Sequence, residues 1–387
     1  MRGRRQGSGS LRLADADELP AALADALSGG PPVAPLPPGP VERAQTLAML
    51  EPDQPLEPDA ALVVSTSGST GRPKGVLLSA TAVTAAAAAT HERLGGAGDW
   101  VLALPPHYVA GLMVLARALV AGTQAHPVAA DLSDLPDAVP RLQGRRYLSV
   151  VPTQLARGLR RPAVSDALRA LDAVLVGGGA LPEPLAEAAA RAGIAVVTTY
   201  GMSETCGGCV YDGRPLPGVD VRLAADGRVS LHGPVLFSGY RRRPDLTAAA
   251  LVDGRLVTAD RARWDGDRLV VLGRVDDVVV SGGMNVDLAE VERQVRSWSG
   301  LDGADVAVVG IPDPEWGTAV VAVVEQSGWR EGAVDALREH LRARLPGYAA
   351  PRRLVGRVPL PRTSSGKIDR LRIVADLTSD EEQARER

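Results

Sequence analysis

The chain has 387 residues, more than one hydrophobic core usually serves, so its length predicts two domains. Hydrophobic residues make up 45% and charged residues 23%, a balance that is typical of globular proteins and excludes disorder, collagen and coiled coil. A net charge of -3 and only 3% aromatic residues argue against a nucleic-acid or anionic-membrane surface, and the two cysteines fit a reducing cytoplasm.

The first 40 residues show no pattern of globular structure. Residues 1–10 have a basic start without the apolar stretch of a signal peptide, which indicates a disordered tail. Residues 28–40, SGGPPVAPLPPGP, hold proline or glycine at most positions, which predicts an extended linker. We therefore interpret residues 1–40 as tail and linker, and expect compact structure to begin near Val41. No run of 18 uninterrupted apolar residues occurs, so the sequence predicts no membrane span.

From Ala60 to about residue 201, short β-rich runs alternate with segments of helical length. One helix is expected to run from an N-capping Ser79 to about Leu94. Such alternation is typical of parallel strands joined by helical crossovers, with functional loops at the carboxyl ends of the strands. The sequence therefore predicts an α/β fold whose large domain, 41–275, holds helix-flanked sheets.

The pattern changes twice after this alternation. Short strands and turns follow residue 218. At Asp276 a fresh unit begins, with the helical segment DLAEVERQVRSW, two apolar strands and the amphipathic segment AVDALREHLRARL. These elements predict a smaller α+β domain over 276–387.

The positions of the lysines are unusual. Among 43 lysine and arginine residues, only Lys74 and Lys367 are lysines, and both lie in short loops rich in serine, threonine and glycine. A general drift toward arginine explains the bias but not these two positions. We infer that both loops need a compact ammonium group, which a planar guanidinium does not replace.

Residues 65–75, STSGSTGRPKG, follow an apolar run and are typical of a phosphate-binding loop. Glycines let successive backbone N–H groups converge on a polyphosphate, hydroxyls add donors, and Lys74 supplies charge. The predicted nucleotide-binding residues are Ser65, Thr66, Ser67, Gly68, Ser69, Thr70, Gly71 and Lys74. The spacing differs from that of a P-loop NTPase, which disfavours that class. The alternative is a surface turn without a ligand.

This loop and four later motifs together resemble the adenylate-forming acyl-CoA synthetase superfamily. The later motifs are TYGMSET (199–205), TAD (258–260), GRVDDVVVSGGMNV (273–286) and PRTSSGKIDR (361–370). The resemblance implies a large ATP- and acid-binding domain followed by a smaller mobile domain. In this superfamily a carboxylate attacks the α-phosphate of ATP, releasing pyrophosphate, and the thiol of coenzyme A then displaces AMP. Two further segments, LPPHYVAGL and SVVPTQLARGL, are most similar to the branch that activates o-succinylbenzoate for menaquinone synthesis.

The resemblance also implies roles for single residues. The expected catalytic residues are Lys367, Lys74, Glu204 and His107, with Glu204 as the ligand of Mg²⁺ and Lys367 acting on the α-phosphate. The remaining nucleotide-binding residues are Gly177, Gly178, Gly179, Tyr200, Gly201, Met202, Ser203, Asp260 and Arg274. The acid is expected to contact His107, Arg157, Gly178 and Gly201, and Asp276 is the expected hinge between the domains.

Several of these roles have a plainer alternative. Glu204 is alternatively a surface carboxylate, and Asp260 a simple turn former. His107 is alternatively a satisfied core histidine, and Arg157 a solvated helix residue. The glycine run after Val176 is alternatively a plain turn.

The expected function is therefore the ATP-dependent ligation of a carboxylic acid to coenzyme A in the cytoplasm, with Mg²⁺ as cofactor. The alternatives are another aryl- or fatty-acyl-CoA ligase, a stand-alone amino-acid adenylation domain, and a catalytically silent nucleotide-binding scaffold. Small molecules are the expected partners, without nucleic acid, and a homodimer stays open. Cys206 and Cys209 lack the second ligand pair that zinc needs, so we expect them to pack near the acid pocket.

Overall fold

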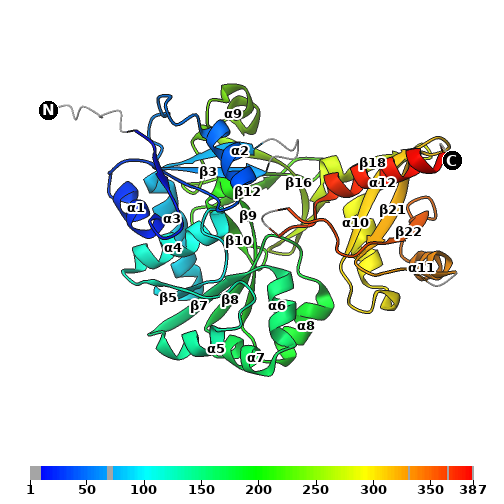
Figure 1. The fold of residues 1–387 in the computed structure, drawn as a ribbon, viewed down its shortest axis with the longest axis horizontal. Coiled ribbons are helices and arrows are strands. Elements are labelled where there is room, and N and C mark those ends of the chain that lie inside the picture. The colour runs from blue at the N-terminus through cyan, green and yellow to red at the C-terminus, as the bar shows by residue number, and fades with distance from the viewer. Residues whose placement is uncertain (1–9, 68–72, 330–331, 364–365, 386–387) are drawn as a thin grey trace. The chain divides into compact units, whose positions relative to one another are not determined.

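The computed structural model describes residues 10–67, 73–329, 332–363 and 366–385 (Figure 1). By their internal contacts these residues form two compact units. The first comprises the described residues up to Arg222, together with Ser230–Thr258 and Trp264–Leu269. The second comprises Leu223–Val229, Ala259–Arg263 and the described residues from Val270 onward. The expected domain limit and hinge at Asp276 stay predictions.

A five-stranded sheet in the first unit begins within the residues that were expected to be tail and linker. Its order is β1 (Arg12–Ala14), β2 (Val33–Pro35), β3 (Leu62–Ser67), β4 (Pro73–Leu78) and β14 (Gly239–Tyr240). Helix α1 (Leu19–Leu27) lies between β1 and β2 in the chain, and α2 (Pro40–Leu50) precedes β3. β1, β2 and β3 are parallel, whereas β3, β4 and β14 pair antiparallel.

The interpretation of residues 28–40 as a linker is wrong, as is a start of compact structure near Val41. Val33 and Ala34 are fully buried in β2, which lies between two other strands. Pro35 ends this strand, so its missing N–H costs no ladder bond, and the next amide donates to Ala14 O at 2.9 Å. Two apolar residues between prolines are therefore enough for a short interior strand. Residues 1–9 of the expected tail lie outside the described residues.

The second sheet of the first unit has seven strands. Its order is β11 (Arg214–Pro215), β10 (Gly207–Tyr211), β9 (Val196–Met202), β8 (Ala173–Val176), β7 (Arg145–Val150), β5 (Gly98–Leu102) and β6 (Ala125–Pro127). The helices between them are α3 (Ala80–Leu94), α4 (Val109–Ala121), α5 (Leu135–Ala138), α6 (Pro152–Leu159), α7 (Pro162–Arg169) and α8 (Glu183–Arg191). Strands β9, β8, β7, β5 and β6 are parallel, which confirms the predicted α/β fold.

Local signals in the sequence explain these elements. Ser79 caps α3 as expected, because its side chain accepts from Ala82 N at 3.1 Å. Strand β8 is apolar along its length, and the last four residues of β7 are buried, because both faces of these strands are covered. Leu148 packs with residues of α6 and α7, while the neighbouring Tyr147 packs with Trp100 in a second buried cluster.

Short strands carry the chain between the two units, as the sequence indicates after residue 218. They are β12 (Asp220–Leu223), β13 (Arg228–His232), β15 (Leu251–Val252), β16 (Arg255–Asp265) and β17 (Arg268–Arg274), with α9 (Pro244–Ala250) before β15. β15 and β16 pair antiparallel.

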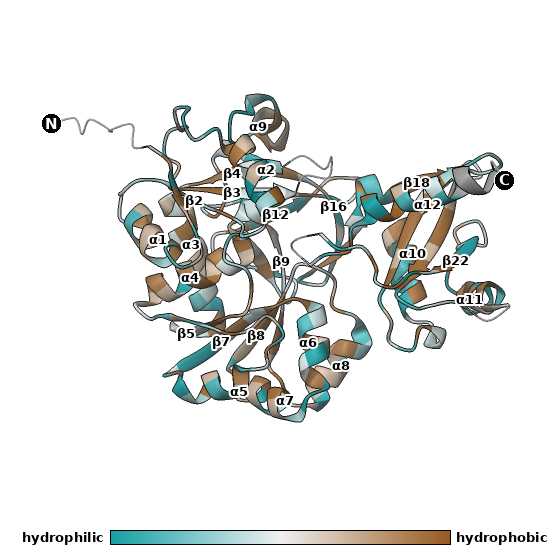
Figure 2. Ribbon diagram, in the orientation of Figure 1, coloured by the Kyte–Doolittle hydropathy of each residue, from teal (hydrophilic) through white to brown (hydrophobic). Residues whose placement is uncertain are grey.

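The second unit is built on a three-stranded sheet with helices on both faces. Its elements are β18 (Val278–Ser281), β19 (Met284–Asp287), α10 (Leu288–Arg296), β20 (Val306–Asp313), β21 (Gly317–Val324), α11 (Ala333–Leu341), β22 (Arg353–Gly356) and α12 (Arg370–Arg385). The hydrophobic colour of β21 in Figure 2 follows from this cover. Val320 packs with residues of α10 and α11, and Val321 packs with Ile373 and Leu377 of α12.

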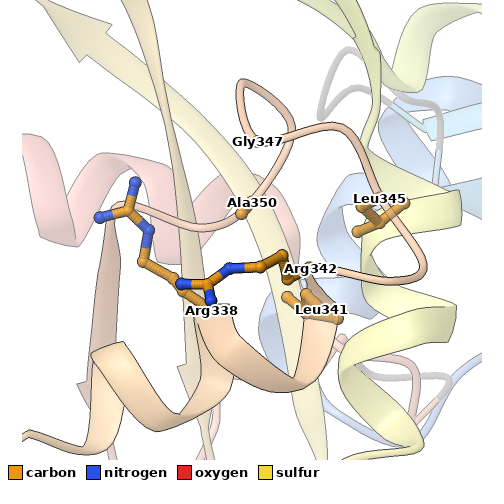
Figure 3. A pocket seen from close by; sticks show the side chains of 6 residues that line it. All are labelled: Arg338, Leu341, Arg342, Leu345, Gly347 and Ala350. Atoms are coloured by element: carbon orange, nitrogen blue, oxygen red, sulfur yellow. The ribbon is translucent and has the colours of Figure 1, made fainter.

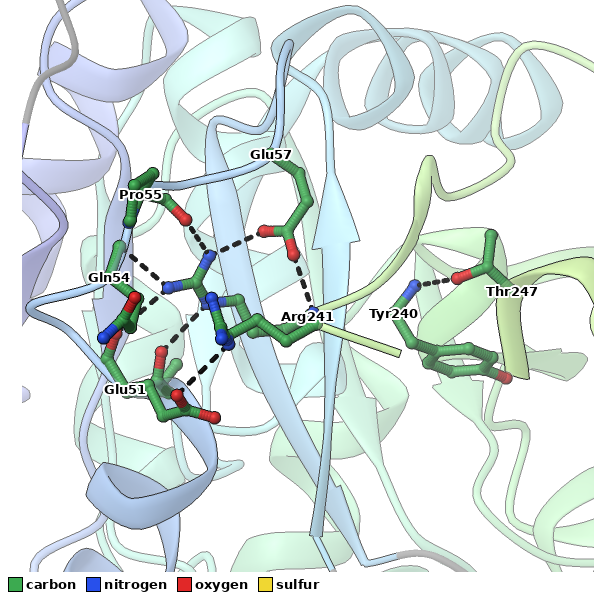
Figure 4. A network of polar contacts seen from close by, with 9 residues as sticks. Glu51, Gln54, Pro55, Glu57, Tyr240, Arg241 and Thr247 are labelled. Carbon is green, nitrogen blue, oxygen red and sulfur yellow. Dashed lines mark hydrogen bonds and ion pairs between the residues drawn. The ribbon is translucent and has the colours of Figure 1, made fainter. Parts of the chain in front are cut away.

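A buried guanidinium organises the loop between α2 and β3 in the first unit (Figure 4). The Arg241 side chain is 0% exposed, and all five of its N–H groups donate hydrogen bonds. The acceptors are Leu50 O, Glu51 O, Gln54 O, Pro55 O and the Glu57 carboxylate, at 2.6–3.0 Å. The loop has no helix or strand of its own, and this side chain joins four of its residues through hydrogen bonds.

We predict that Arg241→Met destabilises the first unit by about 3–5 kcal/mol, because Glu57 loses the cation paired with it and four carbonyl groups lose the hydrogen bonds of the guanidinium. Arg242→Ala is the matched control. Arg242 is partly exposed, and its ion pair with Glu51 at 3.1 Å is worth at most about 1 kcal/mol. Urea unfolding followed by circular dichroism measures both variants. Equal losses would contradict the structural role given to Arg241.

Candidate active site

The glycine run and the YGMSE turn lie at the ends of adjacent parallel strands. Val176, the last residue of β8, pairs with Thr198 of β9, so Gly177 to Gly179 leave the sheet beside Tyr200 to Ser203. The loop that carries His107 follows β5, and α6, which carries Arg157, follows β7 in the same sheet. The structure thus brings four predicted segments of the first unit to one edge, as expected for parallel strands.

Two of these glycines are required by close packing. A Cβ at Gly177 would lie 2.3 Å from Thr199 Oγ1, and a Cβ at Gly201 would lie 2.0 Å from Gly207 O. Gly178 has a φ of +77°, a conformation that favours glycine, whereas Gly179 has no neighbouring atom within 4 Å of such a Cβ. Close backbone approach is therefore a property of particular positions, not of the whole run.

Glu204 belongs to a short 3₁₀ turn, Ser203–Thr205. The carboxylate of Glu204 accepts a hydrogen bond from a tyrosine. Tyr240 Oη donates to Glu204 Oε1 at 2.7 Å, and Phe237 N donates to the backbone oxygen of Glu204 at 2.9 Å. Burial and the neighbouring Glu204 raise the pKa of Tyr240, so the phenol stays protonated and remains a donor. In the preceding turn Met202 N donates to Thr205 Oγ1 at 2.9 Å.

The donor chemistry at Glu204 fits a magnesium ion bound largely by phosphate. The described residues contain no group of three or more histidine, cysteine, aspartate and glutamate side chains that could hold a metal. Mg²⁺ is often bound by one or two carboxylates together with substrate phosphates, so a protein cage is not needed. Among the described residues, Glu204 is the one that would hold it, through its carboxylate.

Lys74 lies on β4, directly opposite Thr66 of β3. Thr66 Oγ1 donates to Lys74 O at 3.4 Å, and Lys74 Nζ lies 5.5 Å from the centre of the Tyr240 ring. Ser65 pairs with Gly75 in the same antiparallel ladder. Tyr240 therefore contacts both Lys74 and Glu204. The predicted phosphate-binding residues Gly68, Ser69, Thr70 and Gly71 lie outside the described residues, and Ser67 ends β3.

His107 is half-buried, with its ring 4.2 Å from that of Tyr108. Burial lowers the pKa of His107, and Glu42 partly opposes this shift. Tyr108 Oη in turn donates to Glu42 Oε1 at 2.5 Å. Arg157 is exposed on α6. This position is compatible with both predictions, an acid anchor and a solvated helix residue.

In the second unit, Arg274 joins two predicted residues. Its guanidinium makes two hydrogen bonds of 2.8 Å to the Asp276 carboxylate and lies 3.5 Å from Asp260 Oδ1. The hydrogen bond from Arg274 is the main cause that lowers the pKa of Asp276. The expected ribose ligand, the expected nucleotide contact and the expected hinge residue are therefore neighbours.

The residues on either side of the short segment that ends at Lys367 are joined by hydrogen bonds. Arg362 forms a β-bridge with Ile368, and Thr363 N donates to Lys367 O at 2.7 Å. Desolvation lowers the pKa of Lys367, nearby Arg274 adds to the lowering, and Asp260 opposes it. These influences place Lys367 within electrostatic reach of the Asp260–Arg274 pair.

Arginines hold both ends of this loop on the second unit. Arg362 donates to Asp305 at 2.6 Å and to Glu325 at 2.7 Å. Arg370 donates at 2.7 Å to Glu292, a carboxylate that is only 8% exposed. The loop is therefore attached to the sheet and to α10 on either side of Lys367.

Cys206 and Cys209 are free, buried thiols next to the Glu204 turn. Burial raises the pKa of both thiols, which makes them poor nucleophiles.

In the described parts of the chain no helix has the length and apolar character to cross a membrane. A hollow of about 200 Å³ in the second unit contains none of the predicted residues (Figure 3), and it is lined by Arg338, Leu341, Arg342, Leu345, Gly347 and Ala350.

Sequence reasoning missed Tyr240 and Gln154. Tyr240 precedes three arginines, a pattern typical of an exposed turn, and its partner Glu204 lies 36 residues away. Gln154 Nε2 donates to Ala103 O at 3.0 Å, which fastens the segment before His107 to the start of α6. No local signal in the sequence marks either contact, because both join segments that are distant along the chain.

Comparisons with known proteins identify the family of the chain. The model of the AMP-binding enzyme family matches residues 11–240, and that of the AMP-binding enzyme C-terminal domain matches residues 301–367. The chain belongs to the AMP-binding enzyme family.

Individual relatives and solved structures are similar to this chain over most of its length. A probable 2-succinylbenzoate–CoA ligase of Mycobacterium tuberculosis is 44% identical over 357 residues, covering 89% of this chain and 91% of the relative. A 2-succinylbenzoate–CoA ligase of Bacillus cereus is 31% identical over 334 residues, covering 80% and 69%. In fold, the chain is similar to an o-succinylbenzoate CoA synthetase from Bacillus subtilis in complex with its acyl-adenylate, with a TM-score of 0.76, 23% identity and coverage of 95% and 96%.

We predict that Gly201→Ala destabilises the first unit by about 1–3 kcal/mol, because the new methyl group overlaps Gly207 O and forces β9 from β10. Gly179→Ala, in the neighbouring loop, is the control, since its methyl group meets no atom within 4 Å. Thermal unfolding compares the two variants with the wild type. A Gly201→Ala protein as stable as the Gly179→Ala protein would show that the packing argument is wrong.

Proposed function

We propose that the chain ligates 2-succinylbenzoate to coenzyme A at the expense of ATP, through an acyl-adenylate, with release of pyrophosphate and AMP. The observation that carries this proposal is the 44% identity to a relative of that name over 89% of the chain. The site supports it, because an acidic turn, a lysine and close-packed glycines lie where a nucleotide would be held in the first unit.

The first half-reaction brings several anions together, so cations and oriented donors must stabilise the developing charge. Lys74 is proposed to bind the departing phosphates, and Lys367 the α-phosphate and the attacking carboxylate. Asp260 would accept hydrogen bonds from the ribose hydroxyls, with Arg274 beside it. Mg²⁺ held by Glu204 would neutralise phosphate charge. The glycines at the ends of β8 and β9 would let the backbone approach the adenine and the acid.

The second half-reaction requires Lys367 to leave and the thiol to enter. We propose that the second unit rotates about Asp276 between the two steps, because a few dihedral angles at such a position absorb a large movement. The bidentate contact between Arg274 and Asp276 holds the side chain of the proposed hinge in the described state.

The two carboxylates of 2-succinylbenzoate demand an anchor, since only one of them is activated. A mostly apolar pocket rejects benzoate or a fatty acid weakly, whereas a fixed donor for the second carboxylate discriminates strongly. His107 and Arg157 are the proposed anchors. Because its pKa is lowered, His107 would be neutral and would donate one hydrogen bond to the second carboxylate, through one ring nitrogen. A bound carboxylate that favours the protonated form would make both ring nitrogens donors.

We also propose that the protein acts in the cytoplasm, where ATP and coenzyme A are supplied and where the two buried cysteines stay reduced. Its partners are these small molecules and the acid. A homodimer is a further proposal, and sedimentation velocity of the purified chain measures it directly.

The test of the function is an acid panel with the purified chain, ATP, Mg²⁺ and coenzyme A. Mass spectrometry follows the acyl-adenylate and the thioester with 2-succinylbenzoate, benzoate and a fatty acid. Turnover of another acid alone would favour a different acyl-CoA ligase. An adenylate without transfer to free coenzyme A would indicate a stand-alone adenylation domain, and no adenylate with any acid would indicate a silent scaffold.

We predict that Lys367→Arg lowers the rate of adenylation by about 100- to 1000-fold, because a forked guanidinium does not occupy a point-charge position. Thioester formation from supplied acyl-adenylate should survive, which serves as the internal control. In the wild type, adenylation should fall as pH rises through the lowered pKa of Lys367, because the ammonium is lost there. Equal losses in both half-reactions would remove Lys367 from this role.

We predict that His107→Ala and Arg157→Ala each lower kcat/KM for 2-succinylbenzoate about 10- to 100-fold, the loss expected for a hydrogen bond to a charged group. A monocarboxylic analogue should be affected much less, since it lacks the anchored carboxylate. Steady-state kinetics with both acids provide the comparison. Unchanged discrimination in either variant would reject that residue as an anchor.

A further inference from the structure

Tyr240 makes more contacts with predicted active-site groups than its position in the sequence indicates. Its hydroxyl donates to Glu204 Oε1 at 2.7 Å, and its ring faces Lys74 Nζ at 5.5 Å from the ring centre. Phe237 packs edge-on against the same ring, with centroids 4.9 Å apart. One side chain therefore contacts the expected metal ligand with its polar end and the expected phosphate-binding lysine with its face.

The backbone around Tyr240 is fixed from several sides (Figure 4). Tyr240 pairs with Val76 in the sheet, and its N–H donates to Thr247 Oγ1 at 2.9 Å. The next residue, Arg241, is anchored by its buried guanidinium, and its own N–H donates to Gly75 O at 2.7 Å. The ring is only 8% exposed, so it has little freedom to choose another position.

This arrangement selects one oxygen of the Glu204 carboxylate. A phenol that donates to Oε1 leaves Oε2 as the oxygen available to a metal, and fixes the plane of the carboxylate. Groups that orient a metal ligand commonly determine affinity in this way. The same ring attracts the ammonium of Lys74 through its π-electrons.

We infer that Tyr240 is a positioning residue, which aims Glu204 at the nucleotide-bound metal through its hydroxyl and holds Lys74 near the phosphates through its ring. The inference deepens the proposed function and rests on it for the identity of the nucleotide site. A purely structural tyrosine would affect folding alone. A positioning tyrosine affects metal affinity through one part of its side chain and phosphate affinity through another.

The first arm of the test measures Mn²⁺ binding, as a probe of the metal, from the electron paramagnetic resonance of free Mn²⁺ with saturating α,β-methylene-ATP. Tyr240→Phe should weaken this binding about 10- to 100-fold, because it removes the donor and keeps the ring. Tyr147→Phe is the matched control. It removes another buried phenol, which donates to Gly96 O at 2.9 Å, and should alter Mn²⁺ binding by less than about twofold.

The second arm asks whether the hydroxyl acts through Glu204. In a Glu204→Gln background, Tyr240→Phe should change Mn²⁺ affinity by less than about twofold, because the oriented carboxylate is already gone. Circular dichroism verifies that each variant is folded, and the saturating nucleotide analogue stabilises the native state of weakened variants.

The third arm separates the ring from the hydroxyl by calorimetry of inorganic pyrophosphate. Tyr240→Leu, which removes both, should bind pyrophosphate more weakly than Tyr240→Phe. The difference between the two variants should vanish in a Lys74→Ala background, since the ring is expected to act through that lysine.

These measurements do not depend on turnover, so the inference and the proposed function fail separately. Wild-type Mn²⁺ affinity in Tyr240→Phe, or no Mn²⁺ binding by the wild type, would overturn the inference even for an active ligase. Conversely, loss of Mn²⁺ affinity in Tyr240→Phe together with no thioester from 2-succinylbenzoate would overturn the proposed function and retain the positioning role.

Discussion

The first unit depends on the five hydrogen bonds of one buried guanidinium. Arg241 has no exposed side-chain surface, and it joins the end of α2, an irregular loop and β14. A charge removed from water is tolerated only when its hydrogen bonds are satisfied, so the loop must keep the conformation that presents its carbonyl groups. Tyr240 precedes Arg241 in the chain, so the anchored guanidinium also limits the movement of Tyr240. Its hydroxyl donates to the carboxylate of Glu204, and its ring faces the ammonium of Lys74.

The parallel sheet adds a second constraint of a different kind. Strands β5, β7, β8 and β9 end at the same edge, so segments that are distant in sequence converge there. At this edge the backbone packs closely, because Gly177 and Gly201 leave no space for a side chain. In the second unit, side-chain ion pairs take the place of close backbone packing. There, ion pairs of Arg274, Arg362 and Arg370 order the groups that surround Lys367.

Much of this organisation was accessible from the sequence, for identifiable reasons. The crossover fold follows from alternating apolar and amphipathic segments, and the cap at Ser79 is a local signal. The short strand at Val33 was missed because proline content describes a window of residues, while burial depends on neighbouring strands supplied from elsewhere in the chain. Tyr240 was missed for the same reason, since only tertiary structure brings it to Glu204.

For the predicted site residues, the structure gives positions and contacts, whereas their roles depend on a substrate. The positions of Glu204, Lys74, Asp260 and Arg274 beside suitable partners follow from the described contacts. The roles of the residues remain predictions, because chemistry with a substrate is not a property of the chain alone. Arg157 illustrates this limit. It is an exposed cation on a helix, and its role depends on which acid lies against it.

The loop that carries Lys367 is fastened on both sides, by Arg362 to Asp305 and Glu325 and by Arg370 to Glu292. The ammonium group therefore travels with the folded unit and has little independent reach. In the proposed reaction its arrival and departure are displacements of a whole rigid body. Displacements of this kind occur on the microsecond-to-millisecond scale of domain motions, far slower than a side chain changes rotamer. The proposed switch is then timed by the movement of the unit and not by that of the lysine side chain.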